Sequence, residues 1–255
     1  MNEGVEKYVE MQRSTIYDTE DADVERYKEI TCGIGSEAFE QIVSDRCYMM
    51  HWSYLPDLTY NKDRVALDFG CGVGRLMIGW RNYFARIDGV DLSLKMLENC
   101  KKHLLQHNIT NANLYHCNGY DIRDVPSDTY DVVYSELVFE HICVHDIRHN
   151  YLKEFLRVLK QDGELSILTK AGNAYPKDSP YSSGWYDNNY DAQHTNGMCD
   201  TRIEDLLALS DELHALGYYN VYFGTHKMSP EDDNVPEHTH FLLIKAHKYG
   251  RGSTD

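Results

Sequence analysis

The chain has 255 residues, enough for one large domain, or for a domain with a cap, and for a substantial core. Acidic residues number 41 against 25 lysines and arginines, which gives a formal net charge of −16 at pH 7. Such a surface repels nucleic-acid phosphates and anionic membranes at long range, so neither is an expected partner. The need for solubility is an alternative explanation, and we attribute most of the excess of acidic residues to it.

The cysteines and the N-terminus indicate a cytoplasmic protein. The seven cysteines form no Cys-x-x-Cys pair, and their odd number favours reduced, packed thiols. Residues 1–6 show neither a charged-then-apolar leader nor a myristoylation pattern. No apolar run approaches the ~18 residues needed to span a bilayer.

Residues 1–60 are richer in aromatic and charged residues than a linker. Segments 20–30 and 36–54 have helical character, because apolar residues in the second recur at three- and four-residue steps. We expect an N-terminal helical cap over residues 1–60 and a main domain over residues 61–255.

The next segment combines a strand, a glycine turn and an acid. An apolar run at 65–67 leads into Asp68-Phe69-Gly70-Cys71-Gly72-Val73-Gly74, and Asp91 ends a second apolar run. This is the layout of a nucleoside-binding βαβ unit, in which the acid takes the ribose hydroxyls. The third glycine comes one residue early for a dinucleotide fingerprint. Asp68 would also repel a pyrophosphate but attract the ammonium of an amino-acid tail.

These features resemble the first motif of the class I S-adenosylmethionine-dependent methyltransferases, whose cofactor has an ammonium, a ribose, an adenine and no phosphate. Residues 118–126 are similar to the family segment that holds the adenine. Residues 135–142 resemble the region beside the methionine moiety and the substrate, and 159–165 resemble the turn into strand five. The resemblance covers residues 61–170 strongly and 200–247 weakly. It implies S-adenosylmethionine as cofactor, S-adenosylhomocysteine as product, and cofactor contacts from Asp68, Gly70, Cys71, Gly72, Gly74, Asp91, Leu92, Asp121, Ile122 and Ser135.

From Arg64 onward, strand and helix patterns alternate, which predicts a parallel sheet covered on both faces. Ser93 and Asp146 are the expected N-caps of two of the helices. The resemblance implies an α/β, Rossmann-like, doubly wound sheet of seven strands with the last one antiparallel. Strands are expected at 64–69, 86–91, 112–117, 130–134, 163–169, 219–224 and 238–246, and helices at 75–84, 93–106, 146–159 and 202–216.

Residues 171–200 interrupt this alternation with a long, aromatic-rich stretch. It leaves the sheet at the carboxyl edge, where ligands of open α/β sheets bind, so we expect a substrate lid. A disordered insertion is the alternative, but disordered segments are poor in aromatic residues. Aromatic residues beside carboxylates would suit a cationic or ring-bearing acceptor. The candidate substrate contacts, with structural packing as the alternative, are Glu136, Tyr186, Tyr190, His194, Tyr17 and Trp52.

His141 is the candidate catalytic residue. Methyl transfer is an in-line displacement, so an enzyme mainly aligns the acceptor. An oxygen or ammonium acceptor must lose a proton, which a histidine can take near neutral pH. In the related family a Glu-His pair at this position often only packs the loop, and this alternative stays open.

The sequence does not favour a metal site. Glu136 and Glu140 miss by one residue the Glu-x-x-Glu-His spacing of metal-dependent methyltransferases. His145 and His149 continue four-residue steps from His141, a pattern that on one helix would suggest a metal site. We attribute the steps to chance, because a helix is expected to begin at Asp146, in the middle of them.

Together these patterns predict an S-adenosylmethionine-dependent methyltransferase that acts on an oxygen or nitrogen of a small molecule, as a monomer or homodimer. The expected strand 130–134 lacks the Pro-Pro-aromatic ending of nucleic-acid amino methyltransferases. The alternatives are a protein side-chain methyltransferase, a catalytically inactive S-adenosylmethionine-binding partner subunit, and a nicotinamide-dependent reductase.

Overall fold

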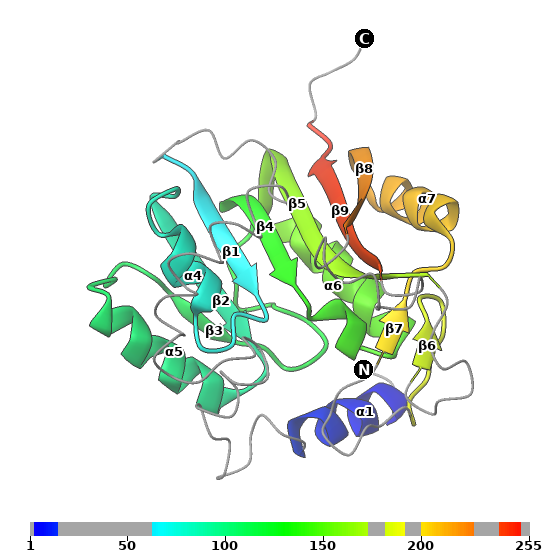
Figure 1. Ribbon diagram of the computed structural model, residues 1–255, viewed down its shortest axis with the longest axis horizontal. Coiled ribbons are helices and arrows are strands. Elements are labelled where there is room, and N and C mark those ends of the chain that lie inside the picture. Colours follow the sequence, from blue (N-terminus) through cyan, green and yellow to red (C-terminus); the bar gives the residue numbers. More distant parts are fainter. Residues whose placement is uncertain (1–2, 15–62, 173–181, 192–199, 227–239, 251–255) are drawn as a thin grey trace, which may run out of the picture.

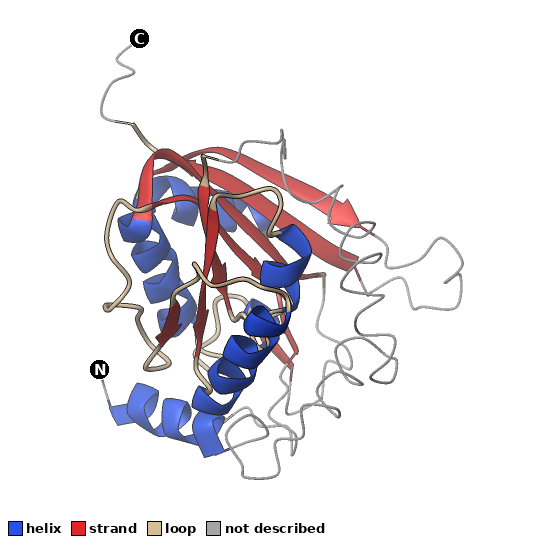
Figure 2. Ribbon diagram, turned by 90° about the vertical axis from the view of Figure 1, so that its left-hand side faces the viewer, coloured by secondary structure: helices blue, strands red, loops and turns tan. Residues whose placement is uncertain are grey.

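The computed structural model describes residues 3–14, 63–172, 182–191, 200–226 and 240–250 (Figure 1). In this part of the chain a twisted sheet is covered by helices on both faces (Figure 2). The helices expected at 20–30 and 36–54, and most of the expected cap, lie outside the described residues. None of the helices in the described ranges has the length and apolar character of a membrane span.

The main sheet has seven strands in the order β3-β2-β1-β4-β5-β9-β8. Strands β1 to β5 pair in parallel, and β9 is antiparallel to both of its neighbours. The predicted Rossmann-like fold is therefore confirmed, with the carboxyl ends of β1 and β4 at the point where the strand order reverses. The strands are β1 (Val65–Phe69), β2 (Arg86–Asp91), β3 (Leu114–His116), β4 (Tyr130–Glu136), β5 (Leu159–Ala171), β8 (Tyr218–His226) and β9 (His240–Lys248).

Successive residues of the central strands enter two different cores. In β1, Ala66 packs with α4 (Arg75–Trp80) and α5 (Leu94–Gln106), whereas Leu67 packs with α6 (His145–Val158) and α7 (Leu206–Leu216). This follows because neighbouring side chains of a strand point to opposite faces. A parallel strand covered on both faces therefore reads as the continuous apolar run seen in the sequence.

Helix α1 (Glu3–Ser14) lies below the carboxyl ends of the central strands in Figure 1. Its face of Val5, Tyr8 and Val9 is buried, as expected for an amphipathic helix packed on a core. The Tyr8 hydroxyl donates to the carbonyl oxygen of His141 (3.2 Å) and accepts from the amide of Cys143 (2.8 Å). These two hydrogen bonds fasten α1 to the loop that follows β4.

Several boundaries differ from those predicted. Helix α4, expected over 75–84, ends at Trp80, where the Arg81 guanidinium donates to the Ile78 carbonyl (2.6 Å). Ser93 caps α5 as predicted, through a hydrogen bond from the Met96 amide (3.2 Å). The cap predicted at Asp146 is wrong, because α6 begins at His145.

The segment after β5 contains short strands. Strands β6 (Ser182–Gly184) and β7 (Asp200–Arg202) pair in parallel, so the part of the expected 171–200 loop that is described is not structureless. The C-terminal helix accordingly begins later than predicted, at Leu206, where the Asp205 carboxylate accepts from the amides of Leu207 and Ala208.

Candidate active site

The glycine loop after β1 is held against β2 and packed tightly on the loop after β4. The amides of Gly70 and Cys71 both donate to the Val90 carbonyl (2.8 and 3.0 Å). Gly70 has a φ of +76°, and a Cβ there would lie 2.3 Å from Cγ2 of Val138. Gly74, with a φ of +87°, is the N-cap of α4. Left-handed backbone and lack of space together explain why glycine occupies position 70.

Asp91, at the end of β2, holds the loop through its carboxylate. Oδ2 accepts from the Gly72 amide and Oδ1 from the Ser93 amide, both at 2.8 Å. Burial raises the pKa of Asp91, and the hydrogen bonds from the Ser93, Gly72 and Leu92 amides oppose that rise. Each carboxylate oxygen has a second lone pair, so the side chain can accept a vicinal pair of hydroxyls and still hold the loop.

Asp68 is a buried carboxyl group of the site with one oxygen that has no hydrogen bond in the described part of the chain. Its side chain is 2% exposed, and its Oδ2 makes no hydrogen bond within the described residues. Burial raises the pKa of this carboxyl well above its usual value, and the positive charge of Arg75 opposes the rise. A buried carboxylate is costly without a partner. A ligand cation at this position would supply one.

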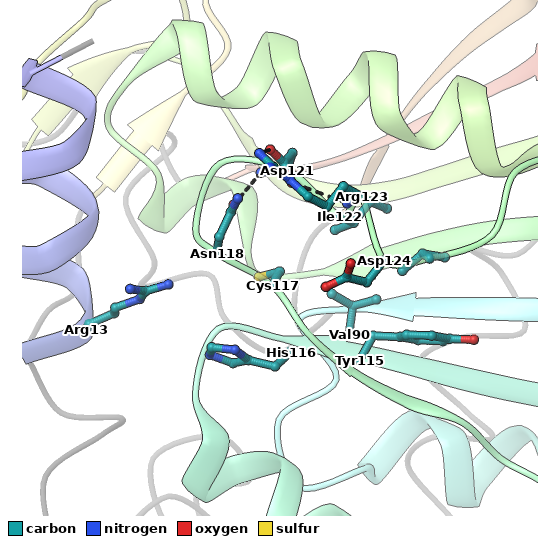
Figure 3. A pocket seen from close by; sticks show the side chains of 11 residues that line it. Arg13, Val90, Tyr115, His116, Cys117, Asn118, Asp121, Ile122, Arg123 and Asp124 are labelled. Carbon is teal, nitrogen blue, oxygen red and sulfur yellow. Dashed lines mark hydrogen bonds and ion pairs between the residues drawn. The ribbon is translucent and has the colours of Figure 1, made fainter. Parts of the chain in front are cut away.

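A pocket of about 210 Å³ opens beside the ends of β2 and β3 (Figure 3). It is smaller than the roughly 300 Å³ at which whole-ligand sites begin, so it suits one part of a ligand, such as a planar ring. Ile122, 2% exposed, forms an apolar part of its wall, and Arg13 reaches it from α1. The lining also includes Val90, His116, Cys117, Asn118, Asp121 and Arg123.

Asp121 is held in place before any ligand arrives. Arg123 donates from Nε to Oδ1 (2.8 Å) and from Nη2 to Oδ2 (2.5 Å), and the Asp121 amide donates to the Asn118 side chain (2.8 Å). The hydrogen bonds from Arg123 are the main reason why the pKa of Asp121 falls to about 2. The carboxylate is therefore charged at neutral pH and available as an acceptor at the pocket wall.

Ser135 and Glu136, the two predicted site residues at the end of β4, have different contacts. Ser135 is buried, and its hydroxyl donates to the Phe69 carbonyl (3.1 Å), which ties β4 to β1. Glu136 forms an ion pair with Arg75 at the start of α4 (3.1 Å). Leu137, the next residue, has a φ of +55°. A bulky residue in the left-handed region is strained, and such strain concentrates at functional sites.

His141 lies in a short 3₁₀ helix, η1 (Phe139–His141), directly after this strained turn. Its side chain is half-buried, and its carbonyl is the one that Tyr8 binds. The neighbouring Glu140 is 2% exposed, and burial raises its pKa to about 7. Glu140 was not among the predicted site residues. Its place before a histidine was visible in the sequence, but its burial was not.

The predicted substrate contacts fall into three groups. Tyr186 lies against His145 on α6 (ring centroids 5.0 Å apart), and Tyr190 packs at the margin of the core shared with α6. Glu136 is at the end of β4. These three side chains therefore come from two places in the fold, the segment after β5 and the end of β4. Tyr17, Trp52 and His194 lie outside the described residues.

The three histidines at four-residue steps are divided by the structure. His141 belongs to η1, whereas His145 and His149 share α6. The expectation that a helix boundary at Asp146 separates His145 from His149 is wrong, because Val144 is the N-cap and His145 is already helical. The two rings meet Glu212 of α7, a residue that the sequence did not associate with them.

Comparisons with known proteins match the central part of the chain to one domain family. A family model described as a methyltransferase domain matches residues 67–167, the span from β1 to β5 that carries the site. Over this span the chain resembles a methyltransferase domain, in keeping with its Rossmann-like sheet. The chain is 29% identical to malonyl-[acyl-carrier protein] O-methyltransferase of Salmonella typhimurium over 122 residues, 47% of this chain and 44% of that relative. The chain spans less than half the length of the curated relatives it matches.

Solved structures resemble this chain in fold. Haemonchus contortus phosphoethanolamine N-methyltransferase 2, in complex with phosphomonomethylethanolamine and S-adenosylhomocysteine, matches with a TM-score of 0.58 and 16% identity over 89% of this chain and 59% of that one. An S-adenosylmethionine-dependent methyltransferase from Methanosarcina mazei matches with a TM-score of 0.57 and 16% identity over 79% of this chain and 97% of that one.

Proposed function

We propose that this protein transfers a methyl group from S-adenosylmethionine to an oxygen or nitrogen of a small-molecule acceptor. The observation that carries the proposal is the buried Asp68 carboxylate, whose Oδ2 is unpaired within the described residues, at the same sheet edge as Asp91. An amino-acid-tailed nucleoside satisfies both groups, whereas a dinucleotide would place phosphates beside Asp68.

The residues present fit this cofactor. Asp68 would pair with its ammonium and Asp91 would accept its ribose hydroxyls. The glycine loop has room because position 72 carries no side chain. Asp121 and Ile122 line the pocket suited to the adenine ring. When bound, the cofactor supplies an electrophilic methyl group on a sulfonium.

The chain itself aligns the acceptor and handles its proton. His141 is positioned by the hydrogen bond from Tyr8 to its carbonyl, in the loop that follows the strained end of β4. Its imidazole would accept the proton that a hydroxyl or ammonium acceptor loses. Helix α1 lies over the same edge, where it would limit the access of water to the reaction.

An oxygen or nitrogen acceptor is supported by the chemistry of the similar proteins. The curated relative is named as an O-methyltransferase, and the Haemonchus structure holds a phosphorylated amine. The chain's negative charge argues against nucleic acid. A protein side chain and an inactive partner subunit remain the rival proposals, and a cytoplasmic location, as a monomer or homodimer, stays a prediction.

The test measures transfer from methyl-labelled S-adenosylmethionine to separate pools of amines, phenols and carboxylic acids, of proteins, and of nucleic acids. We expect label in a small-molecule pool. Replacing His141 with asparagine should lower kcat about 100-fold or more and remove the acidic limb of the kcat–pH profile, while KM for the cofactor changes little. His107→Asn, at the C-cap of α5, is the matched control.

Three outcomes would contradict the proposal. Label in the protein pool alone would establish a protein side-chain methyltransferase. Tight binding of S-adenosylhomocysteine with no label in any pool would establish an inactive subunit. Thermal stabilisation by NADH but not by S-adenosylhomocysteine would establish a reductase.

A further inference from the structure

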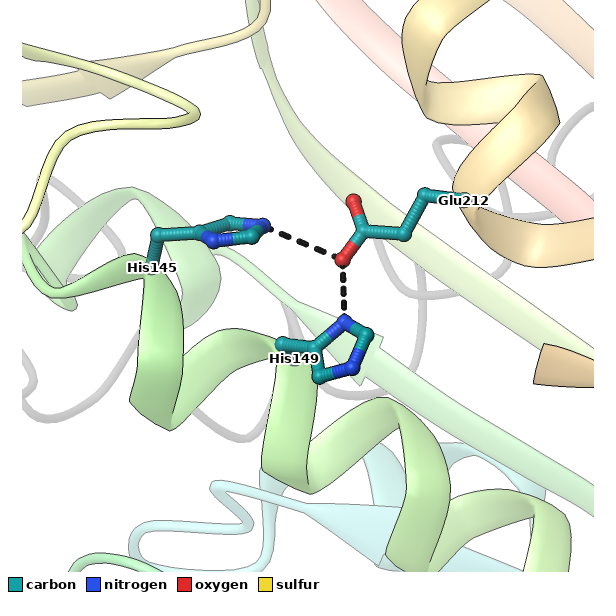
Figure 4. Close-up of side chains that lie close together, drawn as sticks. All are labelled: His145, His149 and Glu212. Carbon is teal, nitrogen blue, oxygen red and sulfur yellow. Dashed lines mark hydrogen bonds and ion pairs between the residues drawn. The ribbon is translucent and has the colours of Figure 1, made fainter. Parts of the chain in front are cut away.

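Two histidines and a glutamate converge between α6 and α7 (Figure 4). His145 and His149 lie one turn apart on α6, so both rings point from the same face toward α7. His145 Nε2 is 3.1 Å and His149 Nδ1 is 2.6 Å from the same oxygen, Oε1 of Glu212. Among the residues that the structure describes, this is the one set of three such side chains whose ligand atoms all lie within 4.8 Å of one another.

The surroundings hold the carboxylate in this orientation. The indole Nε1–H of Trp185 donates to the other oxygen, Oε2 of Glu212 (3.2 Å). Trp185 is itself buried, with the guanidinium of Arg148 4.9 Å from its ring centroid. A carboxylate that is hydrogen-bonded on its outer oxygen and free to coordinate through the inner one is the usual arrangement around protein-bound metals.

The cluster can be reached from solvent. The histidine side chains are 21% and 32% exposed, against 9% for Glu212, so an ion can reach the cluster from the histidine side.

We propose that His145 Nε2, His149 Nδ1 and Glu212 Oε1 bind a divalent transition-metal ion of the zinc class. Two imidazoles and one carboxylate suit zinc and its neighbours, whereas calcium and magnesium prefer oxygen ligands alone. Zinc bonds of about 2.0–2.2 Å in a tetrahedron separate the ligand atoms by roughly 3.3–3.5 Å. The separations of 2.6 Å, 3.1 Å and at most 4.8 Å bracket that value, so small side-chain rotations complete the site.

Binding needs the two ring nitrogens that face Glu212 to carry no proton. Without an ion, each ring can donate its N–H to Oε1 of Glu212, which accepts both. With an ion, the proton of His145 moves to Nδ1 and that of His149 moves to Nε2, and the freed lone pairs coordinate. Water fills the fourth position, as in zinc sites that have three protein ligands.

An ion at this site would join parts of the chain that are far apart in the sequence. His145 follows the His141 loop, Glu212 lies in the C-terminal helix, and Trp185 belongs to the 182–191 segment after β5. The Asp187 carbonyl of that segment also accepts from the His145 amide (2.9 Å). The metal would therefore stabilise the 182–191 segment against α6. This inference is independent of the proposed methyl transfer.

The test titrates the 255-residue chain, after dialysis against a chelator, with Zn²⁺ in competition with a chromophoric chelator. We expect one tight equivalent in the wild type and in the control His214→Asn, which changes an exposed histidine two residues from Glu212 on α7. Glu212→Gln and His149→Asn should each weaken binding by at least about 100-fold. Trp185→Phe, which removes the outer hydrogen bond together with part of a buried ring, should weaken it about 10- to 100-fold.

Cobalt substitution identifies the ligands without relying on any variant. Co²⁺ in the wild-type protein should give the visible d–d absorption of a tetrahedral nitrogen and oxygen site, without a thiolate charge-transfer band. Any of three results would overturn the proposal. The first is the absence of tight Zn²⁺ binding to the wild type. The second is an unchanged affinity in folded Glu212→Gln and His149→Asn proteins, and the third is a thiolate band, because each of these two would place the metal elsewhere.

Discussion

Replacing Glu140 with glutamine tests the electrostatics of the loop that carries His141. Glu140 is 2% exposed, and its Oε2 makes no hydrogen bond within the described residues. Burial is the main cause that raises its pKa from 4.5 to about 7, with Asp200 and Glu136 adding to the rise and Lys170 opposing it. The folded protein therefore holds a proton on this side chain over a pH range in which the unfolded chain has lost it.

The magnitude follows from the size of the pKa change. A rise from 4.5 to about 7 corresponds to about 3 kcal/mol, at roughly 1.4 kcal/mol per unit. Between these two pH values the folded state binds more protons than the unfolded state. The free energy of unfolding must therefore fall as the pH rises through this window. The stabilising contribution is fully present below 4.5 and is lost above about 7.

The assay is urea denaturation of the wild type, Glu140→Gln and Glu98→Gln at about pH 4.5 and about pH 8. Glu98 is an exposed glutamate of α5 and serves as the control. Glutamine has no proton to lose, so the stability of Glu140→Gln lacks this pH dependence. The stability of the variant minus that of the wild type should therefore rise by up to about 3 kcal/mol from the lower to the higher pH. An equal pH dependence in all three proteins would refute the reasoning.

Three further changes test the geometry of the site. Gly70→Ala should destabilise the protein by about 1–3 kcal/mol in urea denaturation, and adding Val138→Ala should recover only part of that loss, since φ stays at +76°. Full recovery would show that the backbone is not strained. Tyr8→Phe should cost about 1–3 kcal/mol, because the buried Cys143 amide loses its acceptor, and an unchanged stability would contradict the docking of α1. Arg123→Gln should raise the pKa of Asp121 from about 2 toward 3.8 in an NMR titration. An unmoved midpoint would show that the ion pair between Arg123 and Asp121 does not form in solution.

The fold could be predicted because its evidence is local in the sequence. The apolar run before Asp68 and the alternating glycines are contiguous, and the apolar run that ends at Asp91 follows closely. When both faces of a sheet are covered, a short continuous apolar run predicts a buried strand. The family resemblance added the antiparallel last strand, which the structure places between β5 and β8.

The remaining features depend on contacts that no local pattern reveals. Helix α1 is too short to form on its own propensity, and it is stabilised by packing and by Tyr8. Strands β6 and β7 have three residues each, below the length at which periodicity can be recognised. Glu212 meets His149 from 63 positions away, so the cluster on α6 and α7 exists only in the folded chain. The hydroxyl of Ser135 is used within the protein, which its sequence position did not indicate.

The central claim, that the loop of residues 68–74 and the carboxylate of Asp91 bind an amino-acid-tailed adenosine, is tested most directly by calorimetric titration with S-adenosylhomocysteine. The wild type and the control Glu98→Gln should bind one equivalent. Asp91→Ala, checked for folding by its unfolding midpoint, should bind about 10- to 100-fold more weakly, since charge-assisted hydrogen bonds are worth roughly 1.5–3 kcal/mol. An undiminished affinity in the folded Asp91→Ala protein, or no binding by the wild type, would contradict the account.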